Sequence, residues 1–249
     1  MVHWTGDRSF EIEGTEFVCC PLLQGGFRSE PGRFCLVKPT AAIGAYEELL
    51  HVTAPKSIVE VGVFDGASTA FIAELAQPRK LVGIDLARPP GDAFDDFLTR
   101  RGFEKAVSMH FGVDQADAAR LGAIAADEFG GDELDLVVDD ASHLLEPTRR
   151  TFNALFPLLR PGGVYVVEDW WWAHTYHSES VWLDEQPLSI MVLELVLASS
   201  YEPEIVANVT ANRDWALVTR GAAPLDPATF DLSQCYGPRG RSLLTWAAT

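Results

Sequence analysis

Two apolar stretches of the sequence end in acidic residues, and a histidine follows one of them. The segment VVDDASHLLEP, residues 137–147, places Asp140 and His143 directly after a run that is typical of a buried strand. The segment GVYVVEDWWW ends its apolar run in Glu168 and Asp169. Carboxylates that converge repel one another unless a cation compensates their charge, and oxygen ligands suit Mg²⁺, Mn²⁺ or Ca²⁺ rather than Zn²⁺. The pattern therefore predicts a site for a hard divalent ion.

His143 lies three residues after Asp140, where it can face a substrate without binding the metal itself. An imidazole, with an ordinary pKa of about 6.5, suits a general base near neutral pH. A metal that polarises a hydroxyl and a base that removes its proton together produce an oxygen nucleophile. The alternative is that DDASH caps a helix and that His143 is a surface residue. The matching acidic end of the second stretch argues against this alternative.

Short β-branched runs alternate with helical patterns from residue 57 onward. Strands are expected at residues 57–63, 80–87, 107–113, 134–140 and 163–169, with helical stripes at 71–76 and 152–159 and a helix near 186–199. Two last strands, 204–210 and 215–221, are joined by a short turn, which indicates an antiparallel pair at a sheet edge. The sequence therefore predicts an α/β fold with a doubly wound, mostly parallel, seven-stranded, Rossmann-like sheet and an antiparallel edge strand.

The carboxyl ends of parallel strands meet at one edge of such a sheet, and neighbouring strands lie about 4.8 Å apart. If the strands at 134–140 and 163–169 are neighbours, their acidic ends converge. We expect one domain of 249 residues. Residues 1–56 would form an N-terminal segment that covers the site, 57–221 the core and 222–249 a C-terminal tail.

Composition narrows the classes of partner. The formal net charge of -17 disfavours nucleic acids and anionic membrane surfaces, and 47% hydrophobic residues suffice for a sizeable core. The four cysteines lack metal-ligand spacing and the N-terminus lacks a signal-peptide pattern, so we expect reduced thiols and a cytoplasmic protein. The longest apolar run, interrupted by Glu194, is too short to cross a bilayer and is expected to be a buried helix.

A glycine-containing loop follows the first predicted strand, in VEVGVFDGAST, and Asp85 ends the second. Glycines let a ligand approach a helix N-terminus, and an acid at the second strand can hold ribose hydroxyls. An NAD loop requires GxGxxG, but Phe64 occupies the position of the middle glycine, and Glu60 and Asp65 would repel a pyrophosphate. S-adenosylmethionine (SAM) has no phosphate and carries an ammonium and a sulfonium group. SAM is therefore the expected cofactor.

The candidate cofactor-binding residues lie in this loop and at the ends of the next two strands. They are Glu60, Gly62, Phe64, Asp65, Ser68, Asp85, Asp114 and Gln115. Asp114 and Gln115 offer an acceptor and a donor for an adenine edge, but they could equally cap a helix. The alternative is that Gly62 and Gly66 make only a tight turn between strand and helix, and Glu60 at an otherwise apolar strand end argues against it.

An aromatic segment, residues 170–182, follows the second acidic strand end. It contains four tryptophans, one tyrosine and two histidines. These rings suit stacking on a sugar or an aromatic substrate, and they suit a buried dimer interface equally well. His174 and His177 are either structural, the commoner case, or additional ligands or bases.

The motifs VEVGVFDGAST, GIDL, GVDQAD, DDASH and RPGGVYVVEDWW together resemble class I SAM-dependent methyltransferases. The resemblance covers roughly residues 59–172. It is specific to the group that contains metal-dependent macrolide-sugar and rhamnosyl O-methyltransferases together with cephalosporin-hydroxylase-like proteins. Ala141 stands where glycine is frequent in that group, which is a mild departure.

The resemblance implies roles for individual residues. By motif match, Asp140, Glu168 and Asp169 would bind Mg²⁺ or Mn²⁺, and His143 would be the catalytic base. The implied reaction is SAM-dependent O-methylation of a small-molecule hydroxyl acceptor, with a sugar favoured. The alternatives are methylation of a catechol-like phenol and a SAM-binding pathway protein that does not transfer methyl groups. No nucleic acid or membrane partner is expected, and a homo-oligomer remains open.

Overall fold

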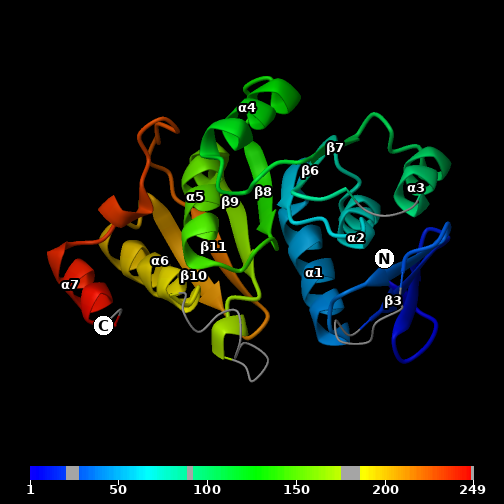
Figure 1. Ribbon diagram of the computed structural model, residues 1–249, viewed down its shortest axis with the longest axis horizontal. Coiled ribbons are helices and arrows are strands. Elements are labelled where there is room, and N and C mark those ends of the chain that lie inside the picture. Colours follow the sequence, from blue (N-terminus) through cyan, green and yellow to red (C-terminus); the bar gives the residue numbers. More distant parts are fainter. Residues whose placement is uncertain (21–27, 89–91, 175–185, 248–249) are drawn as a thin grey trace. The chain divides into compact units, whose positions relative to one another are not determined.

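The computed structural model describes residues 1–20, 28–88, 92–174 and 186–247. The chain divides into two compact units, Met1–Gly112 and Val113–Thr249, each with its own strands and helices (Figure 1). Within the described ranges, no helix combines the length and the apolar character that a membrane span requires. The expected division into covering segment, core and tail of one domain stays a prediction.

The first unit begins with a small four-stranded sheet and a helix. Their bounds are β1 (His3–Trp4), β2 (Ser9–Ile12), β3 (Thr15–Cys19), β4 (Arg33–Leu36) and α1 (Thr40–Thr53). β1, β2 and β3 are antiparallel neighbours, and β4 runs parallel to β3. The alternating sequence pattern buries Phe10 and Phe17 completely, and their ring centroids lie 5.3 Å apart. This sheet therefore has its own aromatic core.

The rest of the first unit alternates strands and helices. The elements are β5 (Ser57–Val61), α2 (Ala67–Ala76), β6 (Lys80–Asp85), α3 (Ala93–Arg101) and β7 (Val107–Phe111). β5, β6 and β7 are parallel neighbours in that order. The register pairs Val61 with Ile84 and Asp85 with Phe111, so the three strands end along one edge. Every residue of β5 is buried, Glu60 included, as its nearly continuous apolar run predicts.

A buried carboxylate connects this unit's two parts. Glu74 of α2 is 3% exposed, accepts a hydrogen bond from the Thr15 hydroxyl of β3 (3.0 Å), and binds the Arg101 guanidinium of α3 at 2.6 and 3.1 Å. A buried charge is tolerated only when it is paired and hydrogen-bonded. Glu74 therefore joins the small sheet to α2 and α3.

The second unit contains the remaining strands. Its elements are α4 (Ala118–Phe129), β8 (Leu134–Asp139), α5 (Leu145–Leu155), the 3-10 turn η1 (Phe156–Leu158), β9 (Leu159–Glu168), the 3-10 turn η2 (Trp172–His174), α6 (Ser189–Tyr201), β10 (Val206–Ala211), β11 (Trp215–Arg220), the 3-10 turn η4 (Leu232–Gln234) and α7 (Pro238–Ala247). β8 and β9 are parallel, whereas β11 runs antiparallel to both β9 and β10. The seven strands β5 to β11 confirm the predicted α/β class with a mostly parallel sheet and an antiparallel edge.

Two helical expectations need adjustment. The stripe at residues 152–159 is buried as predicted, but α5 stops at Leu155 and the chain enters β9 at Leu159, before the Pro-Gly-Gly sequence. The apolar run that was expected to be a buried helix forms α6, but only one side of α6 is buried. Leu195 is fully buried, whereas Leu193 is 48% exposed. A helix that packs on one face of a sheet leaves its opposite side uncovered, whatever its sequence.

Cys20 and Cys35 form a disulfide, so the expectation that all four cysteines are reduced is wrong for this pair. The two residues are 15 positions apart in sequence and carry no spacing motif. The parallel pairing of β3 with β4, which aligns Val18 with Cys35, brings them together. Cys19 and Cys235 are free and buried.

The core of the second unit holds a buried carboxylate beside a tyrosine. Asp139 at the end of β8 is 3% exposed and accepts a hydrogen bond of 2.8 Å from the Tyr165 hydroxyl of β9. Burial raises the pKa of Asp139 to about 7, against the hydrogen bonds from Tyr165 and the Ala141 backbone, and the charges of Asp140 and Glu168 raise it further. The same burial raises the Tyr165 pKa well above its ordinary value.

We expect two of the four cysteines to react with a thiol reagent in denaturant without reductant, and all four after reduction. In the native protein Cys19 and Cys235 should react slowly, because burial raises the pKa of each to about 11 and the thiolate is the reactive form. Quantitative thiol labelling read by mass spectrometry checks this. Cys20→Ser should expose three thiols in denaturant; four reactive thiols in unreduced wild type would contradict the disulfide.

We also expect Asp139 to make the metal-free protein less stable as pH rises. Its folded pKa lies above the unfolded value, so the folded state binds more protons between about pH 4 and pH 7, and stability falls through this window. Asp139→Asn removes the titration. From about pH 4 to pH 8, the free energy of unfolding of the variant should increase relative to that of wild type by on the order of a few kcal/mol. Denaturant titrations in a chelator measure this, and parallel pH curves would refute it.

Candidate functional site

The candidate metal-binding residues lie at the carboxyl ends of β8 and β9. These strands are parallel, and their register pairs Asp139 with Val167. Asp140 is the residue after β8, Glu168 ends β9 and Asp169 follows it. The parallel register therefore brings both acidic strand ends to one point of the second unit.

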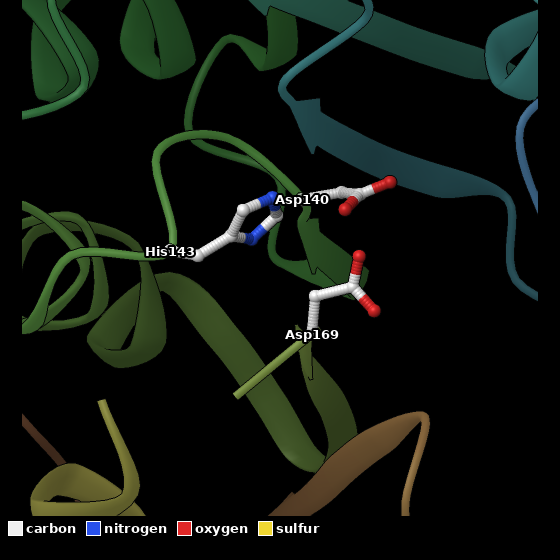
Figure 2. Close-up of side chains that lie close together, drawn as sticks. All are labelled: Asp140, His143 and Asp169. Carbon is white, nitrogen blue, oxygen red and sulfur yellow. The ribbon is translucent and has the colours of Figure 1, made fainter. Parts of the chain in front are cut away.

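Three side chains form a compact group there. One possible ligand atom each of Asp140, His143 and Asp169 lies within 4.8 Å of the others, and all three residues are partly exposed. Figure 2 shows both carboxylates directed to the same side, with the His143 imidazole beside them. His143 and Asp169 have φ values of +57° and +51°, a left-handed conformation that costs about 1 kcal/mol or more for such residues. The surrounding structure must hold both residues in place.

Glu168 lies near this group but is placed differently. It is 7% exposed, and its charge together with that of Asp140 raises the pKa of Asp139. Two partly exposed carboxylates and an imidazole thus lie beside two buried acids. Such a donor set fits a hard divalent cation, whose charge offsets the mutual repulsion of the acids.

The loop that carries His143 is supported by Gln115, a contact that sequence reasoning missed. The Gln115 side chain is 8% exposed; its oxygen accepts from the Ser142 backbone (2.8 Å) and its amide nitrogen donates to the Thr151 hydroxyl (3.2 Å). Asp114 accepts from the Ala116 backbone at 2.8 Å, closing a turn before α4. The helix cap of α4 is Asp117. Contact of Asp114 or Gln115 with adenine stays a prediction.

The predicted cofactor loop connects β5 to α2 in the first unit. Gly62, Phe64 and Gly66 all have positive φ, at 91°, 55° and 88°. A Cβ on Gly66 would lie 2.7 Å from the Phe94 ring, so glycine is required there. The Asp85 carboxylate at the end of β6 accepts hydrogen bonds from the backbone of Val63 (2.7 Å) and Phe64 (2.9 Å). Asp85 thus fixes the loop; its role in holding ribose stays a prediction.

Two of the other candidates around this loop, Glu60 and Asp65, accept hydrogen bonds from neighbouring residues. Glu60 is fully buried and accepts a 2.5 Å hydrogen bond from Thr69 of α2. Asp65 accepts from the Ser29 hydroxyl (2.6 Å) and from the Ala67 backbone (3.1 Å). Ser68 lies partly exposed in the first turn of α2. The Ser29 contact spans 36 residues and left no signal in the sequence.

The first part of the aromatic segment lies at the metal group. The Trp172 ring packs against the His143 imidazole with centroids 4.7 Å apart. His174 shares a 2.8 Å hydrogen bond with Ser189 at the start of α6. Residues 175–185, which include His177 and Trp182, lie outside the described residues. The choice between substrate stacking and an interface stays open for that part.

Comparisons with known proteins agree with the motifs. A family described as a methyltransferase domain matches residues 59–170. Demethylmacrocin O-methyltransferase of Streptomyces fradiae is 49% identical over 61 residues, which are 24% of this chain and 15% of that protein. Mycinamicin VI 2''-O-methyltransferase of Micromonospora griseorubida is likewise 49% identical over 61 residues, 14% of its length. The alignments span less than a sixth of either relative.

A solved structure supports the fold. MycE methyltransferase from the mycinamycin biosynthetic pathway, in complex with Mg, SAH and mycinamycin VI, superposes with a TM-score of 0.57 at 24% identity. The match covers 72% of this chain and 49% of MycE, so the chain spans about half of that protein. Residues 59–170 thus match a methyltransferase-domain family, and the fold of the chain resembles that of MycE methyltransferase.

Proposed function

We propose that this protein is a SAM- and divalent-cation-dependent O-methyltransferase that acts on a hydroxyl of a sugar or glycoside. The observation that carries the proposal is the group of Asp140, His143 and Asp169 at the ends of two parallel strands. The match of residues 59–170 to a methyltransferase-domain family supports it. The names of the sequence relatives, which include methyltransferases for rhamnosyl tetracenomycin, favour a sugar acceptor.

SAM, when bound, supplies an electrophilic methyl group. We propose that the loop from Gly62 to Ser68 holds its amino-acid end. The N-cap of α2 is Gly66, which has no side chain, and Asp65 beside it offers a carboxylate for the ammonium. Asp85 is proposed to hold the ribose with the acceptor capacity left beyond its backbone contacts.

Asp140, Glu168 and Asp169 are proposed to hold Mg²⁺ or Mn²⁺, and a bound divalent ion would lower the pKa of the acceptor hydroxyl. His143 would accept the proton of that hydroxyl at a ring nitrogen. An aliphatic alcohol, unlike a phenol with a pKa near 10, needs both kinds of help. This combination favours a sugar over a catechol. Trp172, beside His143, offers a face for stacking on the acceptor.

The decisive experiment is an acceptor panel with SAM and Mg²⁺, read by mass spectrometry for the gain of one methyl group. Glycosides with free hydroxyls should be methylated. Faster turnover of catechols than of any glycoside would favour the phenol alternative. Tight SAM binding without turnover across the panel would favour a non-methylating protein.

We expect activity to require a divalent cation. Asp140→Asn and Asp169→Asn should each lower the rate at least tenfold and weaken Mn²⁺ binding, while the fold survives, because removing one crowded carboxylate relieves repulsion in the metal-free protein. Glu168→Gln should act in the same direction. Asp127→Asn, at an exposed acid of α4, is the matched control and should change neither quantity. Full turnover in excess chelator would eliminate the metal proposal.

We expect His143→Ala to lower the rate by roughly 10² to 10⁴, the range for loss of a general base, with SAM affinity unchanged. If His143 is the base and not a ligand, Mn²⁺ affinity should fall much less in His143→Ala than in Asp140→Asn. The wild-type rate should fall below neutral pH, because a protonated imidazole accepts no proton. His51→Ala, at an exposed histidine of α1, is the control. A large loss of Mn²⁺ affinity in His143→Ala would reassign His143 as a ligand.

A further inference from the structure

Each of the three residues of the turn between β10 and β11 contacts one of three consecutive residues, Asp169 and the first two residues of the aromatic segment. The backbone oxygen of Asp214 accepts from the Asp169 amide (3.0 Å). The backbone oxygen of Asn212 accepts from the Trp170 indole (2.9 Å). The Arg213 guanidinium carbon lies 4.4 Å from the centroid of the Trp171 ring. These contacts continue the antiparallel pairing of Trp215 with Glu168 beyond the end of β9.

The side chain of Asn212 fixes the shape of this turn. Its oxygen accepts hydrogen bonds from the backbone of Asp214 (2.8 Å) and Trp215 (3.0 Å). The backbone N–H of Asn212 donates to the Trp215 carbonyl at 3.0 Å. Asn212 is exposed, as is Arg213. The contacts therefore form at the surface, where filling the hydrophobic core does not require them.

The contacts of the turn lead directly to the metal group. Asp169 has a left-handed backbone, and its amide is held by Asp214 on one side while its carbonyl accepts from the Trp172 amide (3.0 Å). Trp172 in turn packs against His143. The indole N–H of Trp171 has no hydrogen-bond partner among the described residues, so stacking on Arg213 is the polar contact that orients this ring.

We propose that residues 212–214 are a positioning element for the acceptor side of the site. They hold Asp169 in its strained conformation for the cation and hold Trp172 against His143. The inference rests on the proposed metal-dependent function and extends it to residues that bind neither cofactor nor metal. A plain hairpin turn would close β10 onto β11 with no effect on cation binding.

The test is calorimetric titration of the whole protein with Mn²⁺ in the presence of SAH, which needs no turnover. Asn212→Ala removes one acceptor oxygen and with it two hydrogen bonds, and it should raise the Mn²⁺ dissociation constant about tenfold. Asn212→Asp keeps the acceptor oxygen and should stay within about twofold of wild type. Arg213→Ala leaves the Asn212 hydrogen bonds intact and should raise the constant about threefold, in line with an exposed cation–π contact.

Asn208 is the matched control, because it is exposed on β10 and its side chain donates to Thr210 in the same strand. Asn208→Ala should leave Mn²⁺ binding unchanged, and Asn208→Asp measures the effect of added charge alone. Unchanged Mn²⁺ binding in both Asn212→Ala and Arg213→Ala would overturn the inference while the proposed function stands. If Asn212→Ala fails to fold, unchanged binding in Arg213→Ala alone overturns it. Absence of Mn²⁺ binding in wild type would overturn the metal-dependent function and this inference with it.

Discussion

The parallel register of β8 and β9 is the constraint on which the candidate site depends. It pairs Asp139 with Val167, so Asp140, the residue after β8, and Glu168, the last residue of β9, lie at the same level. A shift of one residue would reverse the sides on which successive side chains point and would separate the acids. The hydrogen bond between Asp139 and Tyr165 joins the same two strands inside the core. The buried pair of Asp139 and Tyr165 thus supports the strand register that the partly exposed metal-site candidates require.

Several features of this arrangement contribute unfavourably to the free energy of folding. Asp139 is buried at a raised pKa, carboxylates crowd together, and His143 and Asp169 have left-handed backbones. Strained and electrostatically unfavourable residues persist only where the surrounding structure over-determines them, and they concentrate at functional sites. Here Gln115 holds the DDASH loop by accepting a hydrogen bond from the Ser142 backbone. The turn at residues 212–214 holds Asp169, whose amide donates to the Asp214 carbonyl. A bound cation would remove much of the repulsion.

The loop between β5 and α2, the predicted cofactor loop of the first unit, is also held in a strained conformation by its surroundings. Three left-handed residues shape it, and the Asp85 carboxylate binds its backbone amides. Ser29 reaches Asp65 from the segment beside the disulfide-bonded Cys35, whose amide donates to the Ser29 oxygen at 3.1 Å. The loop is thereby tied to β6 and to the N-terminal segment before any ligand binds.

The sequence alone determined the α/β class, the order of the elements and the identity of the acidic strand ends, because hydrophobic periodicity and glycine spacing are local properties of the chain. Only the tertiary structure decided the contacts between distant residues. Cys20 bonds Cys35 because β3 and β4 pair, Gln115 binds Ser142, and residues 212–214 meet residues 169–171 across an antiparallel edge. No local pattern encodes such contacts, since they depend on strand register and on which surfaces the folded chain brings together.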